Sequence, residues 1–340
     1  MRTVVLARIP SSEASDLIPF LMERGFIDRS AKISRDGDFR LVPVAEGCEG
    51  EFESRGYALS VGPAYTLERR SPQERIAEAF SDMPELLEHL PARWEYVGDI
   101  AIVKLDSVCA PYRERIGRTY SEILGVGTVC ADVAGVKEEF RKPGMEVIYG
   151  AATESVRLEN GILYDFDVSK VMFASGNTDE RNRMGRMDCT GETVVDMFAG
   201  IGYFTLPLAK FSGARIIYAC EKNPESYGFL VKNMELNGVA EKVIPVLGDN
   251  RHMPGKRFAD RIIMGYVQKT SDFLPKALEM IKPDGTIHYH DTFYVGEHRE
   301  RIEEVFSSAC GSEGYRIENL REVKSFAPSV SHYVADVRIL

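Results

Sequence analysis

The chain has 340 residues, 44% of them hydrophobic, and a formal net charge of −10 at pH 7. This length exceeds one typical domain, so we expect two or three. No apolar run approaches the ~20 residues that cross a bilayer, and the first apolar stretch ends at Arg8, too early for a signal peptide. The negative charge argues against indiscriminate nucleic-acid binding but leaves room for a local basic face. These features predict a cytoplasmic globular protein without a membrane segment.

No metal site is expected from the cysteines and histidines. The cysteines form no C-x-x-C pair, so their spacing fits neither a zinc ribbon nor a disulfide framework. His288 and His290 fall on one face of a predicted strand, because strand side chains repeat every two residues. Two imidazoles alone, without a third ligand at a suitable spacing, do not make a metal centre.

Three regions of different pattern follow one another along the chain. Residues 1–70 alternate short apolar segments with turn signals and predict a small α+β domain. Ser71 and Pro72 are typical of the N-cap and first residue of a helix, which places a boundary there. Residues 71–175 predict a second α+β domain, with a strand at 97–103 and a helix at 112–124. Regular alternation of strands and helices indicates a parallel sheet and a Rossmann-like domain over residues 176–340.

A glycine loop follows the first strand of this last domain. The strand ends at Asp196, and Phe198, Gly200 and Gly202 form an F-x-G-x-G pattern. Its glycines permit a tight turn and close approach of the backbone to a ligand. A dinucleotide enzyme requires G-x-G-x-x-G, and Phe204 stands close to the place of the third glycine. An acidic residue before F-x-G-x-G instead suits a sulfonium ligand, because the Asp196 carboxylate can balance the positive charges of the ligand directly or through water.

The next two strands of the predicted sheet also end in polar residues. Glu221 closes the second strand, where a carboxylate can accept hydrogen bonds from both hydroxyls of a ribose. Asp249 and Asn250 follow the third strand, where their side-chain oxygens can accept hydrogen bonds from the amino group of adenine. The carboxyl ends of parallel strands share one edge of a sheet, so these groups converge. Asp196, Glu221 and Asp249 at three successive strand ends together predict an S-adenosyl-L-methionine site. Each of these carboxylates alone is explained nearly as well by helix capping.

Segments along most of the chain resemble one family, the tRNA wybutosine-synthesis aminocarboxypropyltransferases of archaea and eukaryotes. These enzymes are relatives of the tRNA guanine-N1 methyltransferases that act at position 37. The matching segments are residues 90–94, 111–118, 141–143, 171–181, 196–204 and 260–267. The resemblance implies an α/β fold, with a class I methyltransferase-like Rossmann domain whose mixed sheet has seven strands. Two smaller α+β domains precede it.

The end of the fourth strand separates the two kinds of relative. In the methyltransferases this strand ends in Asn-Leu-Pro, which positions the nucleophilic nitrogen, whereas this chain has Met264, Gly265 and Tyr266. The resemblance therefore implies transfer of the 3-amino-3-carboxypropyl group of S-adenosyl-L-methionine to 4-demethylwyosine at position 37 of phenylalanine tRNA. A sulfonium carries three carbons, and alignment with the nucleophile decides which one is attacked. No residue is assigned as a chemical catalyst.

The resemblance also implies contacts around the cofactor. Arg181 would bind the methionine carboxylate through its guanidinium fork, with an exposed helical arginine as the alternative. Ala174 occupies a place where the family can have a serine, and Ser175 is the candidate to replace it. Tyr203 and Tyr266 are candidates for stacking on the flipped base. Core packing explains both tyrosines equally well.

The implied partner is phenylalanine tRNA, bound at its anticodon loop. Residues 1–70 resemble the small N-terminal domain of the methyltransferase relatives, which implies contact with the body of the tRNA. Basic residues of the middle region are candidates for phosphate contacts. They are Arg113, Arg115, Arg118, Lys137, Arg141 and Lys142. A solvated helix face explains the first three nearly as well.

Three alternative functions compete with this interpretation. A tRNA guanine-N1 methyltransferase is disfavoured by the Met264–Tyr266 segment. A non-catalytic tRNA-binding protein or a nicotinamide-dependent oxidoreductase is disfavoured by the intact acidic strand ends and by the missing third glycine. The sequence leaves open the oligomeric state, the proton acceptor and the breadth of tRNA substrates.

Overall fold

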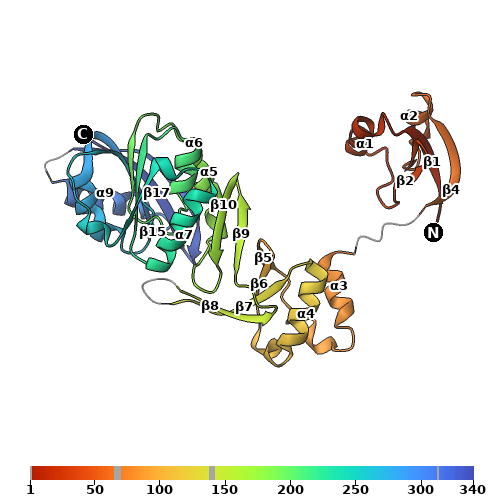
Figure 1. Ribbon diagram of the computed structural model, residues 1–340, viewed down its shortest axis with the longest axis horizontal. Coiled ribbons are helices and arrows are strands. Elements are labelled where there is room, and N and C mark those ends of the chain that lie inside the picture. Colours follow the sequence, from red (N-terminus) through yellow and green to blue (C-terminus); the bar gives the residue numbers. More distant parts are fainter. Residues whose placement is uncertain (1, 65–69, 138–141, 312–313) are drawn as a thin grey trace. The chain divides into compact units, whose positions relative to one another are not determined.

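The computed structural model describes residues 2–64, 70–137, 142–311 and 314–340. The chain forms two compact units, residues 1–79 and 80–340 (Figure 1). Within the described residues, no helix is both long enough and apolar enough to span a lipid bilayer.

The first unit is built on a four-stranded antiparallel sheet with the strand order β2-β3-β1-β4. Its strands and helices are β1 (Arg2–Pro10), α1 (Ala14–Glu23), β2 (Ser34–Asp36), β3 (Phe39–Pro43), α2 (Glu49–Glu53), β4 (Ala58–Ala64) and α3 (Pro72–Ala79). Leu21 of α1 and Phe52 of α2 are fully buried against the apolar face of the sheet. The small α+β domain expected here is present.

The predicted start of α3 is confirmed by two reciprocal hydrogen bonds. The Ser71 hydroxyl accepts a hydrogen bond from the backbone N–H of Glu74 at 3.2 Å, and the Glu74 carboxylate accepts one from the Ser71 N–H at 2.6 Å. This pair is a capping box, which satisfies two N–H groups that the first helical turn leaves without partners.

The second unit begins with a four-stranded sheet in the order β5-β6-β7-β8. Its elements are β5 (Trp94–Val97), β6 (Ile100–Lys104), α4 (Arg113–Leu124), β7 (Thr128–Lys137) and β8 (Lys142–Tyr149). The predicted helix at 112–124 is confirmed, but the single strand predicted for 97–103 is wrong. Gly98 has a φ of +53°, and a Cβ there would lie 2.2 Å from the Ser155 hydroxyl. The chain therefore turns at Gly98 and Asp99 and returns as a hairpin.

A second hairpin leads from this sheet into the Rossmann-like domain. It consists of β9 (Glu154–Glu159) and β10 (Ile162–Asp167), and α5 (Thr178–Arg186) follows it. Tyr164 and Phe166 of β10 are buried in the same apolar cluster as Val194 and Leu206 of the Rossmann-like domain. The hairpin is therefore packed onto the larger domain.

The Rossmann-like domain contains a seven-stranded sheet in the order β13-β12-β11-β14-β15-β17-β16. The first five strands in this order are parallel, and β17 and β16 pair antiparallel at the end, so the predicted mixed sheet is confirmed. Its strands are β11 (Thr193–Asp196), β12 (Ile216–Glu221), β13 (Val243–Leu247), β14 (Ala259–Met264), β15 (Ile281–Tyr294), β16 (Tyr315–Ala327) and β17 (Val330–Ile339). Its later helices are α6 (Thr205–Phe211), α7 (Pro224–Leu236), α8 (Leu274–Met280) and α9 (His298–Cys310).

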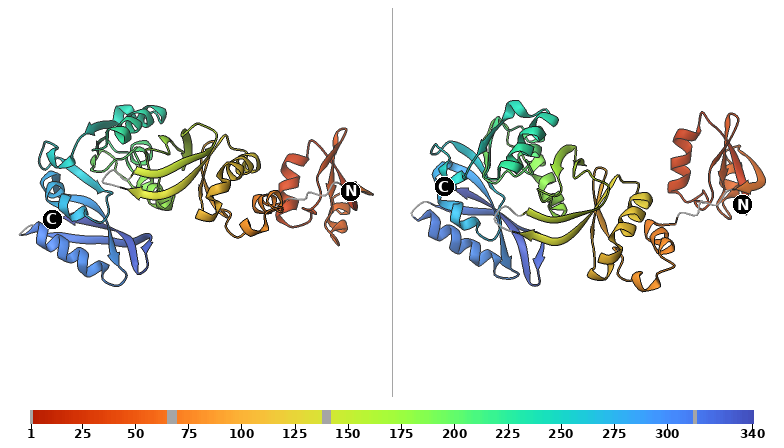
Figure 2. Two further views of the ribbon diagram at one scale, coloured as in Figure 1. Left: turned by 90° about the horizontal axis from the view of Figure 1, so that it is seen from below. Right: turned by 60° about the horizontal axis from the view of Figure 1, so that its bottom comes forward.

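Both faces of this sheet are covered, as expected for strands that are buried on both sides. Val194 and Val195 are adjacent on β11 but belong to different apolar clusters, because neighbouring strand side chains point to opposite faces. The cluster of Val194 includes residues of α6 and α7, and that of Val195 includes residues of α8 and α9. Figure 2 shows α6 and α7, in green, on the opposite side of the sheet from α9, in blue.

Short 3₁₀ turns occur between the larger elements. They span Pro84–Leu86, Ser107–Tyr112, Ser175–Asn177, Ala240–Lys242, Asn250–His252 and Thr270–Phe273. The turn at Asn250–His252 directly follows the third strand, so it presents its first residue at the edge of the sheet where the predicted site lies.

Asn233 on α7 joins the hairpin to the glycine loop. Its side chain accepts a hydrogen bond from the Asp165 N–H at 2.7 Å and donates to the Asp165 and Ile201 carbonyls at 3.1 Å. Asn233→Ala would leave these buried backbone groups unpaired, so we expect the free energy of unfolding to fall by about 3 kcal/mol. Denaturant titration measures this loss. The exposed Glu235→Ala on the same helix should change the free energy of unfolding by less than about 0.5 kcal/mol, and equal effects of the two variants would contradict the assignment.

Candidate functional site

The carboxyl ends of β11, β12, β13 and β14 surround a cavity of about 250 Å³, the cofactor cavity. Most of the sequence-predicted ligand contacts lie on its wall. These are Phe198, Gly200, Tyr203, Glu221, Asp249, Asn250 and Tyr266. The parallel strands bring together residues that are up to 68 positions apart in the chain, as the rule for ligand sites in open α/β sheets requires.

Asp196 lies beneath the glycine loop and does not line the cofactor cavity. Its carboxylate is fully buried and accepts hydrogen bonds from the Thr205 hydroxyl at 2.7 Å and from the Phe198 N–H at 3.2 Å. Burial raises the pKa of Asp196 to about 6. The structure therefore gives this carboxylate a role in shaping the loop, whereas the sequence suggested a direct or water-mediated contact with the ligand.

Glu221 stands at the end of β12 and faces the cofactor cavity. Its two carboxylate oxygens accept hydrogen bonds from the Gly200 N–H at 2.7 Å and from the Asn223 N–H at 2.6 Å. These bonds hold both oxygens in fixed positions, and each oxygen keeps further acceptor capacity. Burial raises the pKa of Glu221. The arrangement suits a pair of neighbouring hydroxyl donors.

The end of β13 supplies a carboxylate and an amide to the same cavity. Asp249 accepts a hydrogen bond from the Arg251 guanidinium at 2.6 Å, and this contact lowers the pKa of Asp249. Asn250 is buried, and its side-chain N–H donates to the Met197 carbonyl at 2.6 Å. The Asn250 Oδ1 is buried without a hydrogen-bond partner. An unpaired buried acceptor on a cavity wall is matched by an N–H donor on a ligand.

Aromatic rings also line the cofactor cavity. The rings of Phe198 and Tyr266 are stacked with centroids 5.0 Å apart, and Phe273 meets Phe198 edge-on at 4.9 Å. The Tyr203 hydroxyl donates a hydrogen bond to the Met172 carbonyl. Phe273 and Met172 were not predicted, because no local pattern in the sequence separates them from ordinary core residues.

A second cavity of about 200 Å³ adjoins the first and shares walls with it. The shared residues are Met172, Phe198, Tyr203 and Gly265. Arg181 lines this second cavity, and its guanidinium is bound to the buried Glu159 carboxylate at 2.5 Å and to the Ala174 carbonyl at 2.9 Å. The Ser175 hydroxyl donates to Glu95 at 3.0 Å, and Ser175 lines neither cavity.

The predicted phosphate contacts lie on another part of the second unit. Arg113, Arg115 and Arg118 are exposed on α4, with Arg113 3.1 Å from Glu146 and Arg115 2.6 Å from Asp82. None of the three lines the cofactor cavity or the second cavity. Arg141 lies outside the described residues, as do the side chains of Lys137 and Lys142. Contact of these residues with phosphate stays a prediction.

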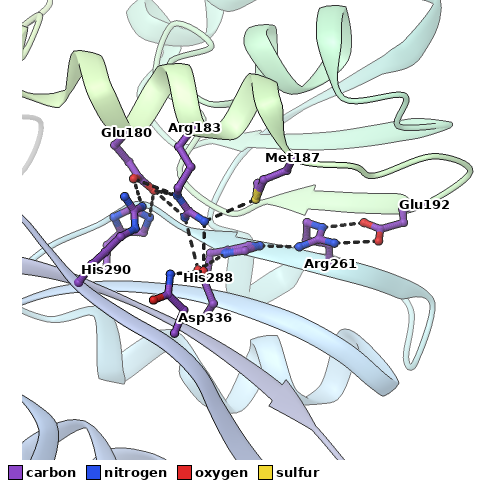
Figure 3. Close-up of polar contacts among 10 residues, drawn as sticks. Glu180, Arg183, Met187, Glu192, Arg261, His288, His290 and Asp336 are labelled. Carbon is purple, nitrogen blue, oxygen red and sulfur yellow. Dashed lines mark hydrogen bonds and ion pairs between the residues drawn. The ribbon is translucent and has the colours of Figure 1, made fainter.

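A buried polar network ties α5 to the sheet beside the second cavity (Figure 3). Glu180 pairs with Arg183 at 2.7 Å, Arg183 with Asp336 at 3.1 Å, and Asp336 with His288 at 2.5 Å. No group of three or more His, Cys, Asp or Glu side chains in the described part of the chain is arranged to hold a metal ion. His288 and His290 both belong to hydrogen-bonded or ionic contacts inside the protein.

Comparison with known proteins identifies the family to which the chain is related. Residues 155–318 match the TRM5/TYW2 methyltransferase domain, residues 76–153 the TYW2 N-terminal domain, and residues 8–53 the tRNA methyltransferase 5 N-terminal domain. The chain is 43% identical over 269 residues to the tRNA(Phe) (4-demethylwyosine(37)-C(7)) aminocarboxypropyltransferase of Pyrococcus horikoshii, covering 78% of this chain and 96% of that protein. The chain belongs to the TRM5/TYW2 family. The predicted family resemblance is confirmed.

Other members of the TRM5/TYW2 family match the chain over different lengths. The tRNA (guanine(37)-N(1))-methyltransferase Trm5b of Pyrococcus abyssi is 33% identical over 340 residues, 98% of each chain. The crystal structure of Pyrococcus horikoshii TYW2 in complex with MeSAdo has a TM-score of 0.72 and 39% identity, and covers 79% of this chain and 99% of that chain. The crystal structure of Pyrococcus abyssi Trm5b has a TM-score of 0.71 and 31% identity, and covers 99% of both chains.

The ion pair of Arg181 with Glu159 can be tested by a double-mutant cycle. Both side chains are nearly inaccessible, at 3% and 7% of full exposure. Arg181→Met would remove the cation nearest to the buried Glu159 carboxylate and leave only Arg157, at 3.4 Å, so we expect the free energy of unfolding to fall by about 2 kcal/mol. Adding Glu159→Leu should restore part of this loss, as measured by denaturant unfolding. Strictly additive losses in the double variant would show that the two groups do not stabilise each other.

Proposed function

We propose that this protein transfers the 3-amino-3-carboxypropyl group of S-adenosyl-L-methionine to C7 of 4-demethylwyosine at position 37 of phenylalanine tRNA. Membership of the TRM5/TYW2 family supports a tRNA-modifying transferase. The higher identity to the aminocarboxypropyltransferase of Pyrococcus horikoshii than to Trm5b, 43% against 33%, supports the kind of group transferred.

The end of β14 is the observation that carries this proposal. Met264 is buried, a Cβ at Gly265 would lie 2.7 Å from a ring carbon of Phe204, and Tyr266 is stacked on Phe198. This edge of the two cavities is thus closed by apolar packing. A side-chain amide that would hold the edge of a guanine during methylation of N1 is absent from residues 264–266, all of which the structure describes.

The cofactor cavity fits S-adenosyl-L-methionine by the chemistry of its donors and acceptors. Glu221 would accept the ribose hydroxyls, the unpaired Asn250 Oδ1 would accept the adenine amino group, and Asp249 would add a negative charge close by. The stacked rings of Phe198 and Tyr266 would pack against the adenosine. When bound, the sulfonium supplies an electrophilic carbon and a neutral thioether leaving group.

The second cavity would hold the target base and the amino-acid end of the cofactor. Arg181 lines it and can present a guanidinium N–H to the methionine carboxylate while Glu159 holds the other side of the fork. Tyr203 lies on the wall common to both cavities, where an aromatic face can stack on the flipped base. The chain's contribution is therefore mainly alignment, which decides the sulfonium carbon that is attacked.

Recognition of the tRNA body and anticodon loop would use surfaces outside these cavities. Arg113, Arg115 and Arg118 on α4 are exposed and can exchange their present contacts for phosphates. The match of residues 8–53 to the tRNA methyltransferase 5 N-terminal domain supports a tRNA contact for residues 1–70 as well. Within this proposal residues 1–70 contact the body of the tRNA, residues 71–175 contact tRNA phosphates, and residues 176–340 carry out the transfer.

Mass spectrometry of the tRNA product tests the reaction directly. Phenylalanine tRNA carrying 4-demethylwyosine is incubated with the protein and S-adenosyl-L-methionine. We expect an added aminocarboxypropyl group and release of methylthioadenosine, because alignment selects the longer carbon chain. A parallel incubation uses unmodified phenylalanine tRNA, and there an added methyl group on guanine-37, with S-adenosylhomocysteine as the second product, would instead establish a guanine-N1 methyltransferase.

Glu221→Gln tests the cofactor cavity. The amide cannot accept at both oxygen positions, so we expect the affinity for S-adenosyl-L-methionine to fall by at least about tenfold, since a hydrogen bond to a charged group contributes about 1.5–3 kcal/mol. Isothermal titration calorimetry measures the affinity. Glu241→Gln, an exposed residue in the turn before β13, is the matched control and should bind as the wild type does. Unchanged affinity in the Glu221 variant would remove this residue from the site.

A further inference from the structure

An exposed aromatic side chain stands at the mouth of the second cavity. Phe326, near the end of β16, lines this cavity and yet keeps 42% of its full exposure to solvent. Phe204 lines the same cavity but is buried in the core. A side chain that is both part of a cavity wall and open to solvent lies at the rim. Phe326 therefore marks the place where a ligand enters.

The strand register places Tyr294 on the same face of the sheet, outside the cavity wall. Thr292 of β15 pairs with His332 of β17, and His332 lines the second cavity. Tyr294 pairs with Val330 in the same register, two residues further along each strand. Side chains on one face repeat every two residues, and paired residues point to the same side of a sheet. Tyr294 thus stands on the face that carries the cavity.

These side chains form an apolar strip across three neighbouring strands. Phe326 lies in the bulge of β16 between the residues that pair with Val330 and with Ser331 of β17. The sheet order β15-β17-β16 then puts Val330 between Tyr294 and Phe326. We call Tyr294, Val330 and Phe326 the rim platform.

Core packing does not explain the rings of the rim platform. Tyr294 is 60% exposed, and within the described part of the chain neither Tyr294 nor Phe326 makes a ring or cation–π contact. Single apolar side chains are common on protein surfaces, but a group of them beside a ligand cavity is typical of a binding surface. Three side chains offer much less area than a stable protein–protein interface requires. A small flat partner fits this surface better.

An unpaired nucleotide is the partner whose chemistry matches. When the target base leaves the anticodon loop for the second cavity, its neighbour in the loop loses a stacking partner. The neighbour is joined to the target nucleotide by one phosphodiester, so it must stay close to the cavity mouth. Aromatic side chains hold such unstacked bases by their faces. Lys324 lines the same cavity two residues before Phe326 and adds positive charge where the phosphates pass.

We propose that the rim platform binds the base of a nucleotide next to position 37, with Phe326 as the main stacking residue. This inference rests on the proposed function, because it requires the target base to occupy the second cavity. Phe326 is a positioning residue, since it would contact the neighbouring base and not the reacting atoms. The platform replaces the stacking that the neighbour loses, and so it holds the loop in the conformation that presents the target base.

The test measures the affinity of the full-length protein for phenylalanine tRNA carrying 4-demethylwyosine, by fluorescence anisotropy. It compares the wild type, Phe326→Leu and the matched control Phe211→Leu. Phe211 on α6 is 51% exposed and lines neither the cofactor cavity nor the second cavity. We expect Phe326→Leu to bind about tenfold more weakly, because leucine has no flat face for stacking. Phe211→Leu should bind as the wild type does. The dependence of affinity on salt should not change, because no charge is removed.

Three further tRNAs, each lacking the base at position 36, 37 or 38, identify the stacked nucleotide. Loss of the base that the platform holds should weaken binding to the wild type by about tenfold. Phe326→Leu should then cause no further loss with that tRNA, because the partner of its ring is already missing. With the other two tRNAs the effect of Phe326→Leu should persist.

The same measurements can overturn the role of the rim platform. It is contradicted by wild-type affinity in Phe326→Leu, or by an effect of Phe326→Leu that persists when base 36 or base 38 is missing and disappears only without base 37. An equal loss of affinity for S-adenosyl-L-methionine in Phe326→Leu would show a general structural defect and would also contradict it. A wild type that binds through Phe326 but transfers no aminocarboxypropyl group would instead overturn the proposed reaction and leave the platform intact.

Discussion

The arrangement of the site depends on a buried network of charged groups that joins α5 to the sheet (Figure 3). Arg183 is held between Glu180 and Asp336, and Asp336 binds His288, which in turn lies 2.8 Å from Arg261. Buried ion pairs of this kind contribute little net stability, because desolvation offsets their attraction, but an incomplete network is costly. The network therefore specifies one position of α5, and with it the positions of Arg181 and Glu180 beside the second cavity.

Apolar packing at the end of β14 sets the chemical character of the site. Gly265 lets the Phe204 ring approach the backbone, and Phe204 in turn covers His290. Tyr266 and Phe198 complete a wall of stacked rings. A wall of this kind offers surface and shape but few hydrogen-bond partners, which suits a flat aromatic base whose reacting atom is a carbon.

The two units of the chain match different branches of the TRM5/TYW2 family. Residues 76–153 match the TYW2 N-terminal domain, whereas residues 8–53 match the tRNA methyltransferase 5 N-terminal domain. The alignment with the aminocarboxypropyltransferase of Pyrococcus horikoshii covers 78% of this chain, and that with Trm5b covers 98%. A module shared with the methyltransferases thus precedes a transferase body that is more similar to TYW2. Such an arrangement is consistent with a tRNA contact that is independent of the group transferred.

The sequence by itself determined the parallel sheet, its glycine loop and the positions of Glu221, Asp249 and Asn250, because strand ends and turn residues are local signals that read directly along the chain. Only the tertiary structure decided that Asp196 supports the loop from below, that Gly98 turns a predicted strand into a hairpin, and that Arg181 is paired with Glu159. It also brought His332 to His290 across two neighbouring strands. These outcomes depend on which residues of distant segments meet in the core, and no local pattern in the sequence records such contacts.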